Sequence, residues 1–62
     1  MFDENEEQMK VELDDIGFGA GMSDENIEKF IKNVLERHQE NPFKSHDEYY
    51  AYVDGIAQKW TD

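Results

Sequence analysis

The side chains with the greatest chemical capacity in this chain are carboxylates, and they are unevenly distributed. Residues 1–28 hold ten acidic residues and a single basic one, Lys10, which gives that segment a net charge of −9. Residues 29–62 hold six acidic and five basic residues, a net charge of −1. A one-sided negative field repels nucleic acid and attracts the basic surfaces of other proteins. The charge pattern therefore predicts a basic protein as the partner.

Carboxylates in such number could also supply general acid–base catalysis, but the sequence offers little else that catalysis needs. A catalytic acid requires a pKa perturbed in a cleft that excludes water, and a 62-residue domain has little room for one. The two serines, Ser23 and Ser45, each precede a predicted helix and are explained as its N-cap. The sequence therefore predicts a protein that is not an enzyme.

A glycine-rich segment over residues 17–21 raises the question of phosphate binding. Its spacing is G-x-G-x-G, whereas dinucleotide-binding loops use G-x-G-x-x-G after a strand, and no clear strand precedes it. Four carboxylates flank it without a basic residue to offset their repulsion of a phosphate, namely Asp14, Asp15, Asp24 and Glu25. The segment is predicted to be a flexible loop, with Phe18 packed onto the core.

Two groups of residues could ligate a metal. The acidic run over residues 3–7 lacks the central glycine and the ligand spacing of a calcium-binding loop. His38 and His46 could meet across the link between two predicted helices and bind a metal together with a carboxylate. A simpler interpretation is favoured, with His38 at a helix C-terminus, where the helix dipole suits a cation, and His46 on the surface. The sequence predicts no metal and no cofactor.

The clearest predicted element is an amphipathic helix over residues 24–39. Ser23 is a suitable N-cap, and Met22 before it has the spacing of a hydrophobic staple with residue 27. Pro42 ends the helix because it disfavours helical geometry at the preceding residue. Apolar residues recur at i, i+3, i+4, i+7 and i+8 and form one stripe, which consists of Ile27, Phe30, Ile31, Val34 and Leu35.

A further helix is predicted over residues 46–60, and the link before it is so short that the two helices must be neighbours. Ser45 and Glu48 match the S-x-x-E capping box. Gly55 falls on the opposite, solvent-facing side, and Tyr50 lies at the edge of the apolar face as an exposed contact residue. That apolar face consists of Tyr49, Tyr52, Val53, Ile56, Ala57 and Trp60.

The N-terminal segment is best interpreted as a helix over residues 4–16. Asp3 and Glu6 are suited to cap its start, and Gly17 is suited to end it. The apolar residues that recur there at helical spacing are Phe2, Met9, Leu13 and Ile16.

A second interpretation of this segment remains open. Met9, Val11 and Leu13 alternate with polar residues, as they would in a half-buried β-strand. A lone strand in a helical chain would have to pair with a second copy or with a partner. Residues 1–7 are so acidic that their disorder also remains open.

These elements define the fold class as all-α, a single small acidic domain of three helices over residues 1–62. There is no cysteine, so neither a disulfide nor a thiolate metal site can form. No apolar run is long enough to span a bilayer, and the acidic N-terminus lacks the features of a signal peptide. We therefore expect a cytoplasmic protein that anionic membranes repel.

The carboxylates interleave with apolar residues and continue into the first turn of the helix at residue 24, so we expect them on a folded surface. We predict that one patch binds the partner electrostatically and that nearby apolar side chains prolong the contact. The predicted acidic contacts are Glu6, Glu7, Glu12, Asp14, Asp15, Asp24, Glu25 and Glu28. The predicted apolar contacts are Met9, Val11, Phe18 and Tyr50.

In size, acidity and lack of catalytic machinery the chain resembles the small DNA-mimic inhibitors carried by phages and mobile elements. The resemblance is one of composition over the whole chain, and no motif carries it. It implies a non-enzymatic protein that binds and occludes a nucleic-acid-binding protein. Known targets of such inhibitors are uracil-DNA glycosylases, restriction enzymes, CRISPR effectors, repressors and nucleoid proteins.

An alternative from another functional class remains open. The chain could be a small helical adaptor or a homodimer that recognises proteins through the face between Tyr49 and Trp60. The acidity would then serve solubility alone. In neither case does the sequence predict direct binding to nucleic acid, because that rests on cationic contacts to phosphates.

Overall fold

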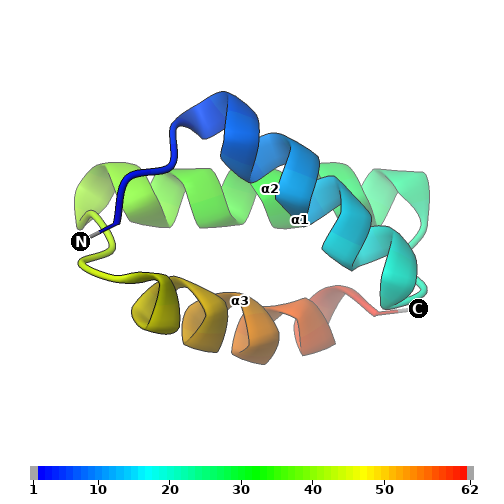
Figure 1. Cartoon of the computed structure of the whole chain (residues 1–62). Coiled ribbons are helices and arrows are strands. Elements are labelled where there is room, and N and C mark those ends of the chain that lie inside the picture. Colours follow the sequence, from blue (N-terminus) through cyan, green and yellow to red (C-terminus); the bar gives the residue numbers. More distant parts are fainter. Residues whose placement is uncertain (1, 62) are drawn as a thin grey trace.

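The computed structural model describes residues 2–61, and within them the chain forms three helices and no strand (Figure 1). These are α1 (Glu6–Gly19), α2 (Asp24–Glu40) and α3 (His46–Trp60). The all-α prediction is confirmed, and the strand alternative for the N-terminal segment is wrong. Helices α2 and α3 run in opposite directions, and α1 crosses obliquely over them. No helix in the described part of the chain is long and apolar enough to cross a membrane.

The start of α1 differs from the sequence prediction. Asn5 is the N-cap, since its Oδ1 accepts from Gln8 N at 2.8 Å while its own N–H donates to Gln8 Oε1 at 3.0 Å. The predicted cap pair of Asp3 and Glu6 is therefore wrong. A reciprocal box satisfies two backbone donors at once, and this register fixes the first turn at Glu6.

The end of α1 also differs, because the helix continues through Gly17 and stops at Gly19. A Cβ atom at Gly17 would lie 2.8 Å from Ile27 Cγ1 and 3.3 Å from Met22 Sδ. The absence of a side chain at Gly17 therefore allows α1 to approach α2 closely. The prediction that Gly17 ends the helix is wrong. Among the described residues only Gly21 has a positive φ, 84°, so the turn itself is confined to residues 20–23.

The remaining caps agree largely with expectation. Ser23 Oγ accepts from Asn26 N at 3.3 Å, and Ser45 Oγ accepts from Glu48 N at 3.2 Å. The Glu48 carboxylate lies 3.6 Å from the Arg37 guanidinium instead of closing a capping box at its own helix. The predicted box is therefore half formed, and its carboxylate ties α3 to α2.

The core lies where the three helices meet. Its buried residues are Met9, Leu13, Met22, Ile27, Phe30, Val34, Phe43, Tyr49, Val53 and Ile56. Phe18 is 69 % exposed, so its predicted packing onto the core is wrong. Phe18 and Leu13 lie on different sides of α1, and only the side with Leu13 faces the other helices.

Residues 2–5 precede α1 and form a short extended segment, here called the strap, that lies at the start of α3. Phe2 N donates to Lys44 O at 3.2 Å, and the Phe2 ring lies 5.1 Å from the rings of both His46 and Tyr49. Phe2 thus lies against the start of α3, while the alternative that residues 1–7 are disordered stays a prediction; residue 1 lies outside the described residues. Packing of this ring holds the strap across the end of α3 where the helix begins.

Candidate functional site

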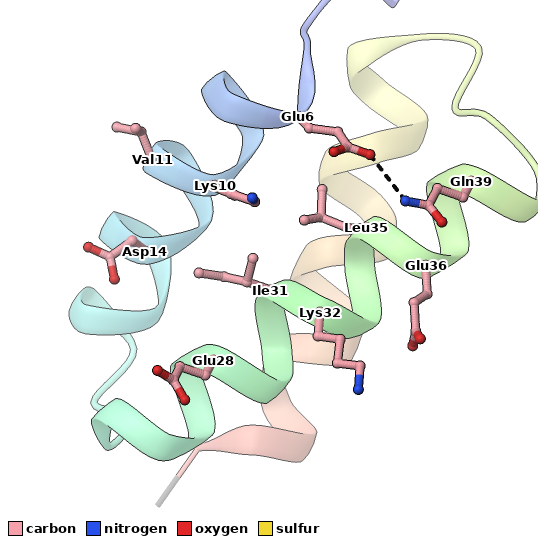
Figure 2. A pocket seen from close by; sticks show the side chains of 10 residues that line it. All are labelled: Glu6, Lys10, Val11, Asp14, Glu28, Ile31, Lys32, Leu35, Glu36 and Gln39. Atoms are coloured by element: carbon pink, nitrogen blue, oxygen red, sulfur yellow. Dashed lines mark hydrogen bonds between the residues drawn. The ribbon is translucent and has the colours of Figure 1, made fainter.

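An open groove with a volume of about 770 Å³ runs between α1 and α2 (Figure 2). Both helices contribute side chains to it, and none comes from α3. The α1 residues are Glu6, Lys10, Val11 and Asp14, and the α2 residues are Glu28, Ile31, Lys32, Leu35, Glu36 and Gln39.

The floor of this groove is apolar. Ile31 and Leu35 point from α2 toward α1, and Val11 lies at the outer edge on α1 (Figure 2). Ile31 and Leu35 are half-buried against the core, whereas Val11 is 70 % exposed. The apolar stripe of α2 is thus wider than the surface that α1 and α3 cover, and its uncovered margin forms the floor.

The rim of the groove is charged, with four carboxylates and two ammonium groups. Gln39 Nε2 donates to Glu6 Oε1 at 3.1 Å and joins the two helices at one end. The ion pairs found among residues 2–61 involve other carboxylates, those of Glu25, Glu48 and Glu4. The charges along the groove therefore face solvent without a partner of opposite sign in the described chain.

The predicted contact residues are only partly brought together. Glu6, Val11, Asp14 and Glu28 line the groove, and Glu7 and Glu12 lie beside Val11 in a smaller hollow of about 500 Å³. The remaining acidic contacts, Asp15, Asp24 and Glu25, are exposed on α1 and α2 outside the groove, as is Phe18. Tyr50 is 45 % exposed and lies on α3.

Met9 was predicted as an apolar contact, and this is wrong. Its side chain is fully buried in the core. Met9, Leu13 and Gly17 are the buried positions of α1, spaced four residues apart, so they share the face that packs against the other helices. Val11 and Phe18 lie one heptad apart on the outer face and are the two most exposed large hydrophobic side chains.

Glu12 has a structural setting that the other predicted acidic contacts lack. Its Oε1 is buried, as is the Tyr49 hydroxyl, and neither forms a hydrogen bond of good geometry among the described residues. Hydrogen bonding toward Glu12 is the main cause that raises the pKa of Tyr50, while burial and then Glu12 raise the pKa of Tyr49. Burial, followed by repulsion from Glu12, raises the pKa of Glu4. Glu12 thus faces α3 and the strap.

This crowding predicts that mild acid stabilises the fold. The folded-state pKa of Glu4 lies above its ordinary 4.5, so protonation is favoured in the folded state. The stabilisation that protonated Glu4 gives to the folded state is fully present below pH 4.5, and it is lost as the pH rises through the raised pKa of Glu4. Excess carboxylates elsewhere act in the same direction. We expect the melting temperature, followed by circular dichroism, to rise between about pH 7 and about pH 5.

The Glu4→Gln variant provides the control for that prediction. It removes the carboxylate whose pKa is raised, so its melting temperature should rise less over the same pH interval. Constant ionic strength keeps general screening fixed between samples. A melting temperature that falls on acidification would contradict the prediction and indicate that ion pairs such as Glu25–Lys29, 3.5 Å apart, dominate.

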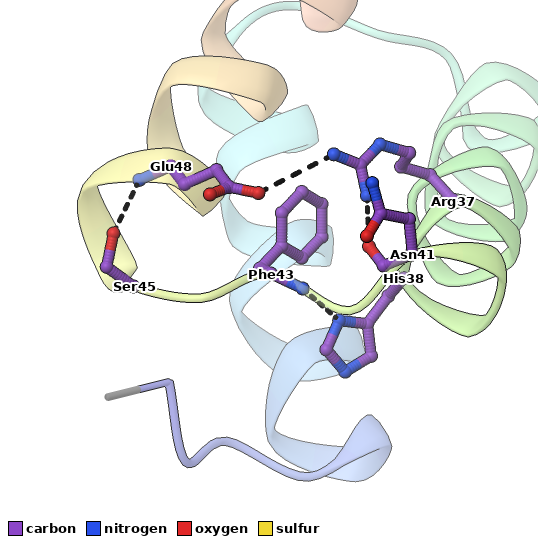
Figure 3. Close-up of polar contacts among 6 residues, drawn as sticks. All are labelled: Arg37, His38, Asn41, Phe43, Ser45 and Glu48. Carbon is purple, nitrogen blue, oxygen red and sulfur yellow. Dashed lines mark hydrogen bonds and ion pairs between the residues drawn. The ribbon is translucent and has the colours of Figure 1, made fainter.

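The two histidines occupy separate positions at the start of α3 and the end of α2. His38 Nδ1 accepts from Phe43 N at 3.2 Å (Figure 3), and His46 Nε2 lies 3.1 Å from Glu4 Oε2. The Phe2 ring stands between them, 5.3 Å from His38 and 5.1 Å from His46. Within residues 2–61 no three His, Asp or Glu side chains are grouped as metal ligands.

The link between α2 and α3 is fastened by Arg37. Its guanidinium lies 4.7 Å from the centre of the Phe43 ring, pairs with Glu48 and donates to Asn41 O (Figure 3). An arginine that stacks on an aromatic ring and pairs with a carboxylate restrains a turn without closing a binding site. We assign this cluster to the fold.

The face of α3 between Tyr49 and Trp60 is used inside the molecule. Tyr49, Val53 and Ile56 are buried, and Tyr52 and Trp60 are half-buried against the core. The buried members of this face are occupied by the core, so an adaptor or homodimer would have to use the half-buried side chains of Tyr52 and Trp60, and that alternative stays a prediction. Tyr50 is the aromatic side chain of α3 that remains exposed.

The groove contains residues that the sequence interpretation did not select as contacts. The sequence places Ile31 and Leu35 in the apolar stripe of the helix over residues 24–39, and its predicted contacts do not include Lys10, Lys32 or Glu36. One signal was available in the sequence. The apolar stripe of α2 includes both i+3 and i+4 positions, so it is wider than the surface that a single neighbouring helix covers. Its exposed margin could be located only after the crossing of α1 over α2 was known.

The groove has an apolar floor and a charged rim. That combination is suited to holding another polypeptide. No protein-family model, curated protein or solved structure matches this chain.

Proposed function

We propose that this protein binds and inhibits a basic, nucleic-acid-binding protein by occupying the surface that would otherwise hold DNA or RNA. One observation supports the proposal above others: the concentrated acidity lies on ordered helices. The exposed carboxylates of α1 and of the first two turns of α2 are Glu6, Glu7, Asp14, Asp15, Asp24, Glu25 and Glu28. The negative field therefore has a fixed shape that a partner can recognise.

Fixed carboxylates can replace phosphates at a basic site. Duplex DNA carries one negative charge per about 1.7 Å of axis, and a helix cannot match that density. It can place single charges where the partner expects phosphates, and the overall field speeds association. Val11 and Phe18 stand exposed among these carboxylates and would slow dissociation by apolar contact.

The proposal is tested by capture followed by competition. A host lysate is passed over the immobilised protein at low salt, and the proteins eluted at high salt are identified. The captured protein is then titrated with labelled duplex DNA in the presence of this chain. We expect this chain to displace the DNA, and its affinity to fall by about tenfold or more between about 50 and about 200 mM salt.

Two matched variants separate the acidic patch from the total charge. One carries Asp14→Asn, Asp15→Asn and Asp24→Asn, and the other carries three amides elsewhere, Glu40→Gln, Asp47→Asn and Asp54→Asn. Asp24 and Asp47 both lie in the first turn of a helix, so the helix-dipole effects are alike. The first variant should bind about tenfold more weakly than the second. Equal loss in both, or affinity that does not change with salt, would contradict the proposal.

A further inference from the structure

We propose that the groove between α1 and α2 seats a positively charged amphipathic helix of the partner. This inference rests on the proposed function and names the element of the partner that is recognised. The shape of the groove, its apolar floor and the charge of its rim all favour such a helix.

The dimensions of the groove suit a short helix. Its lining on α2 runs from Glu28 to Gln39, which spans about 17 Å at the rise of an α-helix. A partner helix of about three turns has the same length. Helix α3 already packs against α2 as a neighbouring helix.

The floor requires an apolar face on the occupant. Ile31 and Leu35 expose apolar surface along about one turn of α2, and Val11 adds to it from the edge on α1. Water covers that surface in the free protein. Side chains at i, i+3, i+4 and i+7 of a partner helix would cover it, which is the helix-in-groove mode of peptide recognition.

Other extended occupants fit the groove less well. A strand would need an exposed sheet edge, and residues 2–61 contain no strand. A polyproline segment is usually held by aromatic side chains, and no aromatic residue lines this groove. A second copy of this chain would bring two strongly negative surfaces together, since each copy carries a net charge of −10.

The rim specifies the charge of the occupant. Glu6, Asp14, Glu28 and Glu36 surround the floor without ion-pair partners in the described chain, against Lys10 and Lys32. Lysine or arginine residues that flank the apolar face of the occupant would meet these carboxylates as the apolar face leaves water. The groove therefore selects a basic amphipathic helix over a neutral or an acidic one.

Defined peptides test this directly. The probe is a labelled peptide of leucine and lysine, about four helical turns long, with leucines at i, i+3, i+4 and i+7. The comparison peptides are a scrambled version of the same composition and a leucine–glutamate version of the same pattern. Fluorescence anisotropy at about 50 and about 200 mM salt measures binding to the full chain. We expect the patterned basic peptide to bind about tenfold more tightly than the scrambled one and the acidic one to bind least.

Variants of the protein locate the bound peptide. Val11→Gln should weaken binding of the patterned peptide by about tenfold, and more than Phe18→Gln, since Val11 lines the groove and Phe18 does not. The pair Asp14→Asn with Glu28→Gln should weaken binding by about fivefold relative to the pair Asp47→Asn with Asp54→Asn on α3. Circular dichroism confirms that each variant is folded.

The outcomes distinguish this inference from the proposed function. If the patterned and scrambled peptides bind alike and Val11→Gln has no effect, recognition is electrostatic only, and the groove is excluded while the proposed function stands. If Phe18→Gln has the larger effect, the peptide docks on the outer face of α1 and the groove is again excluded. If neither basic peptide binds at low salt, the electrostatic basis of the proposed function fails as well.

Discussion

Replacing Phe30 with alanine is expected to unfold a large fraction of the molecules at room temperature. The Phe30 side chain is fully buried at the centre of α2. Its removal costs about 3–5 kcal/mol through lost burial and the cavity left behind. A domain of 62 residues has a free energy of unfolding of about 3–9 kcal/mol. Urea denaturation followed by circular dichroism measures the loss.

Phe18→Ala is the matched control, because it makes the same chemical change at a side chain that is 69 % exposed. Its effect on the free energy of unfolding should stay within about 0.5 kcal/mol. A cost at Phe18 close to that at Phe30 would mean that Phe18 belongs to the core. The comparison therefore checks the packing face of α1 as well as the size of the effect.

Alanine substitution is expected to have opposite effects at two helical glycines. At Gly17 a new Cβ would lie 2.8 Å from Ile27 Cγ1, an atom near the backbone of α2 that cannot simply swing aside. Overpacking of this kind costs about 1–3 kcal/mol, and the gain in helix propensity of about 1 kcal/mol offsets only part of it. At Gly55 a Cβ would have nothing within 4 Å, so the propensity gain remains in full.

We therefore expect Gly17→Ala to lower the free energy of unfolding by about 1–2 kcal/mol and Gly55→Ala to raise it by about 0.5–1 kcal/mol. The midpoint of urea denaturation should move in opposite directions for the two variants, with little change in the slope. Stabilisation by Gly17→Ala would contradict this expectation, because the added Cβ atom would then have room between α1 and α2. The packing of α1 on α2 would then not require a glycine at position 17.

The sequence by itself determined the type and approximate bounds of the second and third helices, while it left the first segment open between a helix and a strand. The predicted ranges 24–39 and 46–60 compare with α2 at Asp24–Glu40 and α3 at His46–Trp60. This succeeds because caps and apolar periodicity act within a few residues of chain, through backbone donors at the helix start and one continuous stripe. The predicted staple residues Met22 and Ile27 are likewise both buried.

The first helix was harder to predict, because its apolar residues lie on two faces. Met9 and Leu13 lie on one side, and Val11 and Phe18 on the other. Either side could have faced the core as far as local pattern shows. The glycine at position 17 decides between them, since it lets α1 approach Ile27 closely and so turns the side with Met9 inward.

The candidate site was harder to predict from the sequence than the helices were, because it depends on how the helices pack. The charge asymmetry of residues 1–28 was evident in the sequence, but the joining of Asp14 to Glu28 around one groove was not. The apolar floor was hidden for the same reason, since Ile31 and Leu35 belong to a stripe whose covered width depends on how α1 crosses α2. Local sequence fixes which residues a helix presents along one face, and only the non-local packing of the helices decides which part of that face stays open to a partner.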